Sequence, residues 1–383
     1  MKVGSVKLKS IGKTFGTTVS VAAIAAVTLA GCGSDNNSAS GGSSSSAASG
    51  SSSAAAADCG GKNSLTAEGS TAQQNAIALF NQVWGQKCQG KNLSYNPTGS
   101  GAGREQFIAK NVDFAGSDSA LKDAQIADAA KRCGDNPAWH LPLVFGPIAM
   151  AYNLEGVDKL VLNADTLAKI FQGQITKWND PAIAALNSGA TLPDTAITPI
   201  FRSDSSGTTD NFQKYLKTAA PEAWTKDTGS EFQGGAGEGA QKSAGVTQAV
   251  QATPGSIGYV EKGFAQQAGL PFAQIDTGAG AVELTDDTAG KAIDAAKFAA
   301  DGNDLVLDLN SIYGTKEAGA YPLVLATYEI VCSAGYDPDT SAAVKSFLTV
   351  SANDGQGGLS SAGYVPLPEK FKERLLTSIQ AIK

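Results

Sequence analysis

The sequence predicts an α/β protein with two lobes, and three observations carry this prediction. From Ser64 onward, short apolar runs typical of strands alternate with helical patterns. About 325 residues follow Asp58, a length that suits two domains better than one. Polar turns rich in hydroxyl groups recur at the ends of the predicted strands, which is where open α/β sheets bind ligands.

The chain begins with a segment that resembles a bacterial lipoprotein signal peptide, residues 1–31. Four lysines, at positions 2, 7, 9 and 13, precede an apolar core over 19–30, and Leu29-Ala30-Gly31-Cys32 closes it. The apolar core is shorter than the ~20 residues that span a bilayer, which argues against a transmembrane anchor. We expect cleavage before Cys32 and attachment of lipid (palmitate) to its sulfur, which would place the protein on the extracytoplasmic face of the cell membrane.

Residues 32–58 are predicted to form a flexible linker behind the lipidated cysteine. Residues 33–58 are almost entirely Ser, Ala, Gly and Asn, with no aromatic residue and no aliphatic side chain larger than that of alanine. Such a segment cannot bury enough surface to offset the entropy lost on ordering. The linker would reach roughly 25 to 30 Å from the membrane.

The first lobe is predicted over residues 59–144 and 321–383. Strands are expected at 64–66, 93–96 and 112–118, with helices over 69–84 and 104–110 between them. The apolar segment 140–153 would carry the chain into the second lobe. The strongest apolar strand of the C-terminal part, 321–332, would return it, and helices over 342–350 and 369–382 would close the lobe.

The second lobe is predicted over residues 145–320. Segments 160–173 and 178–186 have helical patterns, while 197–202 and 257–260 are expected to be strands. The glycine-rich stretch 234–239 lacks the Lys-Ser/Thr of a P-loop and follows no convincing strand, so it is interpreted as a loop.

Composition excludes several classes of function. The formal charge is −7, and removal of the signal peptide, with four lysines and no acid, takes it to −11. An acidic chain without a basic stripe is a poor candidate for nucleic-acid binding. The single histidine, His140, excludes a metal site built from several histidines, and its apolar neighbours favour a packing role over catalysis. We therefore expect no metal and no cofactor.

Four cysteines besides Cys32 favour two disulfides in an exported chain over free thiols or metal ligands. They are Cys59, Cys88, Cys133 and Cys332. Three pairings are possible, and the sequence does not choose among them. The pairing of Cys59 with Cys88 and of Cys133 with Cys332 is weakly preferred, because the first two flank a predicted helix.

The most informative motif is Arg202-Ser203-Asp204-Ser205-Ser206-Gly207-Thr208, at the junction of a predicted strand and helix. The N-terminus of a helix has unpaired N–H groups and a partial positive charge, and so suits a small oxyanion. Arg202 would add a planar fork of donors. By itself, the motif could equally be an ordinary Ser/Thr helix cap.

Three other loops share this character: 69–71, 98–101 and 116–118 each place hydroxyl groups, N–H groups or a carboxylate at a strand end or helix start. Each loop alone could be a cap or a turn. Together, and in this order, they resemble the phosphate-binding lipoproteins of high-affinity phosphate ABC transporters, in the form found in actinobacteria. The resemblance extends from Ser64 to the C-terminus and includes 167–186 and 254–261, segments without an obvious ligand role.

The resemblance implies a type II periplasmic-binding-protein-like fold, with a mixed sheet flanked by helices in each lobe and a hinge between the lobes. It also implies that the protein is a monomer that binds inorganic phosphate and passes it to the permease subunits of an ABC importer. The implied phosphate ligands are Thr71, Ala72, Ser100, Asp118, Arg202, Ser206, Gly207 and Thr208, with Asp204 orienting Arg202. Ala72 would contribute only its N–H, and many relatives have a bulkier apolar residue at this position.

Asp118 is the most diagnostic of these residues on physical grounds. An ionised carboxylate only accepts hydrogen bonds, so it suits an anion that still has a proton. Phosphate near neutral pH has such a proton, whereas sulfate has none and would be repelled. We therefore expect selectivity for phosphate over sulfate.

Three other functions compete with the phosphate receptor. A phosphomonoesterase with a hydroxyl nucleophile beside Arg202 would need a base or a metal, for which the sequence offers no suitable cluster. A receptor for sulfate or molybdate conflicts with Asp118. An interaction or adhesion module without a ligand would leave the four polar loops unexplained.

Overall fold

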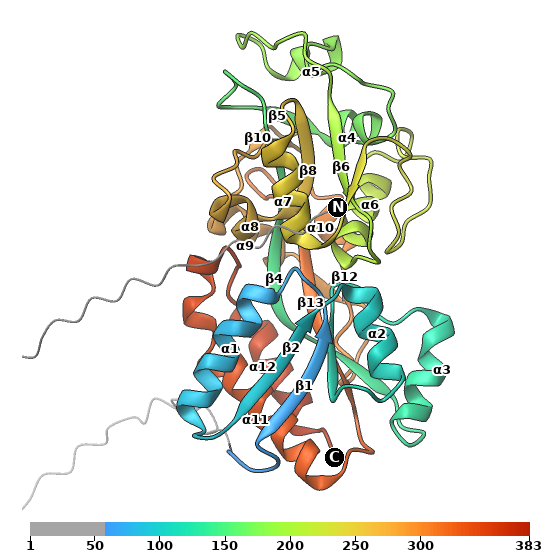
Figure 1. Ribbon diagram of the computed structural model, residues 1–383, viewed down its shortest axis with the longest axis vertical. Coiled ribbons are helices and arrows are strands. Elements are labelled where there is room, and N and C mark those ends of the chain that lie inside the picture. The colour runs from blue at the N-terminus through green and yellow to red at the C-terminus, as the bar shows by residue number, and fades with distance from the viewer. Residues whose placement is uncertain (1–57) are drawn as a thin grey trace, which may run out of the picture. The chain divides into compact units, whose positions relative to one another are not determined.

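The computed structural model describes residues 58–383. The predicted signal peptide, the lipidation site Cys32 and nearly all of the predicted linker lie outside the described residues. Within residues 58–383, the ribbon has two lobes, with the long strands β4 (Ala138–Tyr152) and β13 (Val324–Cys332) between them (Figure 1). Residues 58–137 and the C-terminal helices build one lobe, and most of the middle of the chain builds the other.

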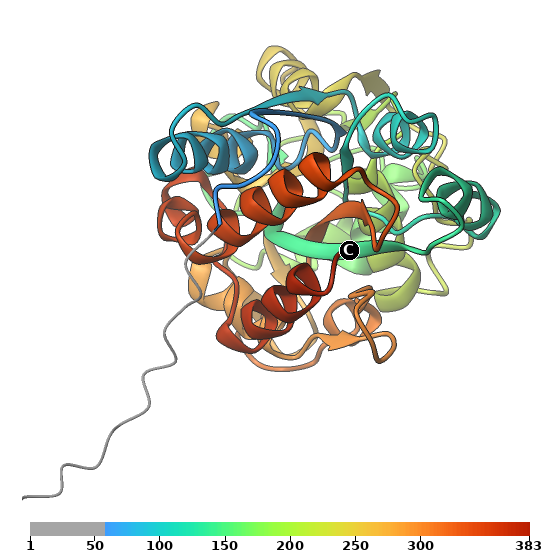
Figure 2. The same ribbon diagram turned by 90° about the horizontal axis from the view of Figure 1, so that it is seen from below.

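The first lobe contains three parallel strands with helices on both faces. The strands are β1 (Ser64–Gly69), β2 (Asn92–Pro97) and β3 (Phe114–Ser117). The helices are α1 (Gln74–Lys87), α2 (Ser100–Ile108), α3 (Asp123–Arg132), α11 (Pro338–Asn353) and α12 (Glu369–Gln380), with two 3₁₀ turns at Gln356–Gly358 and Ser360–Ala362. Seen from below, α11 and α12 lie across the end of this lobe (Figure 2).

The second lobe is built from shorter elements. Its strands are β5 (Val161–Asn163), β6 (Thr198–Arg202), β7 (Glu238–Ala240), β8 (Ser256–Glu261), β9 (Gln274–Asp276) and β10 (Ala281–Val282). The two-stranded sheet of β11 (Lys297–Phe298) and β12 (Leu307–Asp308) packs against the first lobe instead: the Phe298 ring lies 5.2 Å from that of Phe371 in α12, and the Leu307 N–H donates to the Tyr328 hydroxyl of β13. Its helices are α4 (Ala164–Phe171), α5 (Pro181–Leu186), α6 (Gly207–Ala219), α7 (Lys242–Ala252), α8 (Lys262–Gln267), α9 (Asp286–Asp294) and α10 (Asn310–Tyr313).

One mixed sheet extends through both lobes, in the order β2-β1-β3-β13-β4-β8-β6-β7. Strand β4 makes this possible because it changes partner along its length. Its first part pairs antiparallel with β13 as far as Pro147, and from Ile148 onward it pairs antiparallel with β8. The carboxyl ends of β1, β3 and β6 thus lead into loops at the boundary between the lobes.

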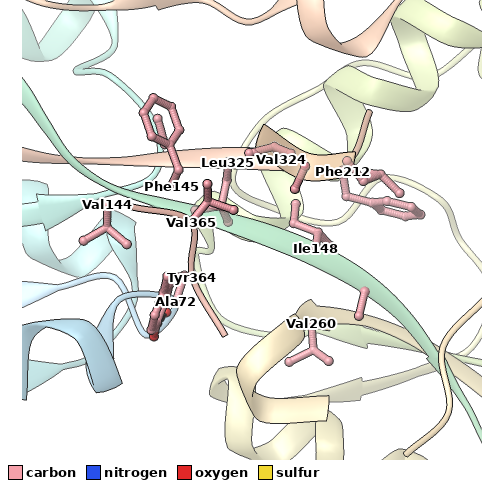
Figure 3. Packing of buried hydrophobic residues seen from close by; sticks show 14 of the residues in the cluster. Ala72, Val144, Phe145, Ile148, Phe212, Val260, Val324, Leu325, Tyr364 and Val365 are labelled. Atoms are coloured by element: carbon pink, nitrogen blue, oxygen red, sulfur yellow. Dashed lines mark hydrogen bonds between the residues drawn. The ribbon is translucent and has the colours of Figure 1, made fainter. Parts of the chain in front are cut away.

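The hydrophobic core follows this shared strand pair. Figure 3 shows Val144, Phe145 and Ile148 along β4, all fully buried, with Leu325 of β13 nearby. Such continuous burial explains why residues 140–153 form one apolar run without alternation.

The sequence predicted about half of these elements, and several predictions need correction. The helix expected from residue 69 begins only at Gln74, because Ser64–Gly69 form β1. Residues 160–173 are not one helix: Val161–Asn163 form β5, which pairs parallel with β9, and only Ala164–Phe171 are helical. The glycine-rich stretch 234–239 is a loop only in part, because Glu238–Ala240 form β7 against β6.

Two disulfides join Cys59 to Cys88 and Cys133 to Cys332, the pairing that the sequence weakly favoured. The second one closes a chain separation of 199 residues and ties the end of α3 to the end of β13.

Candidate functional site

Two helix N-termini, one from each lobe, meet at the boundary between the lobes. Helix α2 begins at Ser100, directly after Gly99, whose φ of 107° few other residues adopt. Helix α6 begins at Gly207 and is capped by Ser206, whose hydroxyl accepts a hydrogen bond from the Thr209 N–H at 3.2 Å. The sequence predicted the start of α2 four residues too late, and the correction makes Ser100 the first helical residue.

Gly207 lies directly against the first lobe. A Cβ atom at this position would be 2.6 Å from both the Asp118 Cβ and the Ser100 Oγ. Only a residue without a side chain permits this approach. Gly207, Ser100 and Asp118, predicted from three separate loops, therefore lie together.

Asp118 follows strand β3 and is buried, with hydroxyl donors on both carboxylate oxygens. Oδ1 accepts from Ser70 at 2.6 Å and from Thr327 at 2.7 Å, and Oδ2 accepts from Ser100 at 3.1 Å. Burial raises the pKa of Asp118 to about 6, against the lowering effect of Ser70 and Thr327. The group is thus an ionised acceptor at neutral pH.

Arg202 ends strand β6 and is held by Asp204. Its Nε donates to Asp204 Oδ1 at 2.7 Å, and its Nη2 donates to the other carboxylate oxygen. Burial alone would lower the pKa of Arg202, but Asp204 more than compensates and raises it. Burial likewise opposes ionisation of Asp204, and Arg202 still brings the pKa of that carboxyl below its usual value. The guanidinium is therefore a fixed, permanent cation.

Thr71 and Ala72 lie between β1 and α1, and both are buried. The hydroxyl of Thr71 is 2.8 Å from that of Ser243 in the second lobe, and Ser243 also lies 3.5 Å from Arg202 Nη1. The Ala72 N–H donates to the hydroxyl of Ser70 at 3.0 Å. The two residues are thus at the boundary between the lobes, where their polar groups have protein partners.

Thr208 is the second residue of α6, and its hydroxyl donates to Glu261 Oε1 at 2.6 Å. Glu261 ends strand β8 and is almost fully buried, and its Oε2 has no hydrogen-bond partner among residues 58–383. All nine predicted binding and supporting residues therefore lie in the loops and helix starts at the boundary between the lobes.

Further hydrogen bonds connect the lobes around this cluster. The Gly101 N–H donates to the Ser205 carbonyl at 3.1 Å, and Asn211 Nδ2 donates to the Asp118 carbonyl at 2.7 Å. The Ser119 hydroxyl donates to Asp210 at 2.5 Å. The lobes are closed on each other, and the cluster lies inside the closure.

Several polar residues of the cluster were not predicted from the sequence. They are Arg104, Glu261, Thr327 and Ser243, while Ser70 lies in the predicted loop 69–71 but had no role assigned. Ser243 is the second residue of α7, so its position at a helix start was the available signal. Thr327 lies within the apolar strand β13, where nothing in the local sequence indicates contact with Asp118.

His140 lies outside this cluster. Its Nε2 accepts from the Leu121 N–H at 2.9 Å, and its Nδ1 lies 2.8 Å from Asp304. Among residues 58–383, no group of three or more His, Cys, Asp or Glu side chains could hold a metal ion.

Comparison with known proteins identifies the family. Residues 41–354 match the model of the PBP superfamily domain. The chain is 50% identical to phosphate-binding protein PstS 3 of Mycobacterium tuberculosis, over 96% of this chain and 98% of the relative. It is 33% identical to phosphate-binding protein PstS of Pasteurella multocida, over 82% of this chain and 88% of the relative.

A solved structure supports the fold. The phosphate-binding protein of Stenotrophomonas maltophilia superimposes with a TM-score of 0.64, at 20% identity, over 82% of this chain and 94% of that one. With the sequence matches, this shows that the chain belongs to the PBP superfamily and, within it, to the PstS family of phosphate-binding proteins.

Proposed function

We propose that this protein binds inorganic phosphate between its two lobes and delivers it to an ABC-type importer. The observation that carries the proposal is the contact of Gly207, at the start of α6, with Asp118 and Ser100 of the other lobe. It places a carboxylate acceptor beside two helix N-termini, so that one small cluster has both donors for an anion and an acceptor for a proton. The names of the relatives agree with this ligand.

The acceptor accounts for selectivity. Near neutral pH, Asp118 is ionised and can accept a hydrogen bond only from an anion that retains a proton. Phosphate meets this requirement and sulfate does not. A sulfate ion would leave two negative groups facing each other in a buried site, a contact that costs on the order of 1 to 3 kcal/mol or more.

The donors account for affinity. Arg202 supplies one full charge, which cannot neutralise a dianion, so the helix starts at Ser100 and Gly207 must supply the rest through N–H groups and dipoles. We expect Thr71 and Ala72 to exchange their present partners, Ser243 and Ser70, for phosphate oxygens. Charge-assisted hydrogen bonds contribute roughly 1.5 to 3 kcal/mol each, which is sufficient in sum for sub-micromolar binding.

The role is binding and transfer rather than catalysis. A phosphomonoesterase would need a base or a metal beside the hydroxyl groups. His140 is engaged by Leu121 and Asp304. The carboxylates of Asp118 and Glu261 accept hydrogen bonds from fixed hydroxyl groups, and that of Asp204 is paired with Arg202. This arrangement favours a ligand held by many static contacts.

The cellular setting belongs to the same proposal. The protein would be a monomer, attached outside the membrane by lipid at Cys32 and docking with the permease subunits of the importer. Within residues 58–383, no helix combines the length and the apolar character needed to cross a membrane.

Isothermal titration calorimetry of the purified protein with inorganic phosphate tests the proposal. We expect one site per chain and a Kd below about 1 µM. A chromogenic phosphate ester, incubated with the same preparation, should release no product. Absence of a binding heat together with absence of any thermal shift in millimolar phosphate would refute the proposed function.

A further inference from the structure

Arg104 is a second buried arginine beside the proposed site, and no sequence motif indicated its role. It lies in α2, four residues after Ser100, and its side chain is 1% exposed. Such a charge is costly to bury unless it is paired or strongly hydrogen-bonded. Arg202 meets this requirement through its pairing with Asp204. The question is which groups compensate the buried charge of Arg104.

Within residues 58–383, Arg104 donates hydrogen bonds to three neutral partners. Nε donates to Gln125 Oε1 at 3.2 Å, Nη1 to Ser117 Oγ at 2.9 Å and Nη2 to Ser230 Oγ at 3.1 Å. Burial lowers the pKa of Arg104, while the surrounding carboxylates of Asp210 and Asp118 favour its charged form. The guanidinium charge is thus offset by carboxylates around it rather than by a bonded counterion.

These partners connect Arg104 to both halves of the proposed site. On the first lobe, Ser117 precedes Asp118, and its hydroxyl donates to the Ser119 carbonyl at 2.6 Å, which fixes the turn that presents Asp118. On the second lobe, the Ser230 carbonyl accepts the Ser206 N–H at 2.9 Å, at the cap of α6. One side chain therefore bridges the Asp118 turn and the support of the α6 N-terminus.

We propose that Arg104 is a positioning residue with two effects. It holds the lobes closed through its hydrogen bond to Ser230, and it supplies a second positive charge to the bound anion without touching it. This inference rests on the proposed function. The bond to Ser230 crosses from one lobe to the other, so opening of the lobes must break it. A bound phosphate adds negative charge near the buried guanidinium, which makes closure more favourable. Loss of Arg104 should then weaken binding mainly by accelerating phosphate release.

Three variants separate the effect of the Arg104–Ser230 hydrogen bond from the effect of the positive charge. Ser230→Ala removes only the hydroxyl that accepts from Arg104. Arg104→Gln removes the charge but keeps a polar side chain, and Arg104→Lys restores the charge without the planar fork. Arg132→Gln is the matched control, because Arg132 also lies in the first lobe and its hydrogen-bond partners, the carbonyls of Phe107, Val112 and Asp113 and the sulfur of Cys332, belong to that lobe as well.

The experiment measures Kd for inorganic phosphate by calorimetry and the release rate by stopped-flow mixing with a fluorescent phosphate scavenger, using the full chain. We expect Ser230→Ala to raise Kd about 3- to 10-fold and Arg104→Gln about 30-fold or more, both through faster release. Arg104→Lys should recover most of the loss caused by Arg104→Gln. Arg132→Gln should leave Kd within about 2-fold of the wild type, even where it lowers thermal stability.

Wild-type Kd and release rate in both Ser230→Ala and Arg104→Gln would overturn the inference. Arg104→Lys binding as weakly as Arg104→Gln would overturn the role of the charge. If Arg104→Gln fails to fold, the Kd and release rate of Ser230→Ala decide whether the inference holds, since deletion of one hydroxyl is a mild change. A wild-type protein that binds no phosphate would refute the proposed function instead, so the two failures are distinguishable.

Discussion

At the scale of single residues, the closed site concentrates negative charge where an anion is proposed to bind. Asp118 and Glu261 are both almost fully buried, and Glu261 contributes to the raised pKa of Asp118. A third carboxyl, Glu329 of β13, is also fully buried and has no hydrogen-bond partner among residues 58–383. Burial of an ionised carboxylate is costly, so these groups should make the stability of the protein depend on pH.

Asp118→Asn should therefore stabilise the ligand-free protein at alkaline pH. The pKa of Asp118 is raised by burial from 3.8 to about 6, so its favourable contribution is complete below pH 3.8 and is lost as the pH rises through about 6. An asparagine side chain does not ionise, so its contribution to stability does not fall as the pH rises. We expect the free energy of unfolding, measured by urea denaturation without phosphate, to increase by about 1 to 3 kcal/mol at pH 8.

The control for this prediction is Asp301→Asn, a substitution of an exposed aspartate, which should have little effect at either pH. The gain in Asp118→Asn should disappear near pH 4. A gain of equal size at pH 4 and pH 8 would contradict the assignment of a raised pKa.

Glu329→Gln should flatten the dependence of stability on pH. Burial raises the pKa of Glu329 from 4.5 to about 8, with a further increase from Asp118 and an opposing effect of Gln73. Its folded state therefore retains a proton that the unfolded chain has lost. The wild-type free energy of unfolding should fall by up to about 1.4 kcal/mol per pH unit between pH 4.5 and 8 on account of this group.

Urea denaturation across this pH range measures the slope. Glu329→Gln should reduce it, whereas Glu317→Gln, at an exposed position, should leave it as in the wild type. Equal slopes in all three proteins would show that Glu329 ionises normally.

At the scale of elements, the site depends on the junctions where strands end and helices begin. Strand β3 leads to Asp118, strand β6 leads through Arg202 to the cap of α6, and β1 leads to Thr71. Because β1 and β3 are parallel neighbours, their carboxyl ends lie at the same edge of the sheet. The rigid elements thus place short loops within reach of one another.

Gly207→Ala should block closure while leaving the fold intact. Gly207 begins α6 with an ordinary helical backbone, so alanine is compatible with the helix itself. Its Cβ, however, would lie 2.6 Å from the Asp118 Cβ, a separation that forces the lobes apart. Calorimetry should show phosphate affinity reduced by about 100-fold or more, since the ligands of the two lobes could no longer act together.

Gly290→Ala provides the matched control, because Gly290 lies inside α9 with open space around its Cα. The same substitution there should increase stability by about 0.5 to 1 kcal/mol and leave phosphate affinity unchanged. Wild-type affinity in Gly207→Ala would mean that the closed contact does not form in the complex.

Sequence patterns predicted elements whose signal is local. They did not predict strands or side-chain contacts that depend on segments far away in the chain. Apolar patterns predicted β8 and β13, and the motif 202–208 predicted that a helix follows β6. The apolar segment 140–153 was expected only to carry the chain into the second lobe, and it forms the strand β4. The strand β5 was missed because its partner, β9, lies more than 100 residues further along the chain. Thr327 and Arg104 were missed for the same reason, since only the folded sheet brings them beside Asp118 and Ser117.

At the scale of the whole described part, residues 58–383, one sheet runs through both lobes while the site lies between them. The connection is the strand pair β4 and β13, and the closure is made by separate bonds such as Asn211 to Asp118 and Gly101 to Ser205. Bending at the shared strands would break those bonds without disturbing either core. In the proposed function, phosphate would favour the closed arrangement.

The central claim is that Asp118 requires the bound ion to carry a proton, and competition calorimetry with phosphate and sulfate at pH 7.5 tests it most directly in the wild type and Asp118→Asn. The wild type should prefer phosphate by at least about 100-fold. Asp118→Asn should lose most of this preference, because asparagine neither repels sulfate nor requires a proton. Equal affinity of the wild type for both ions, or full preference for phosphate in Asp118→Asn, would contradict the claim.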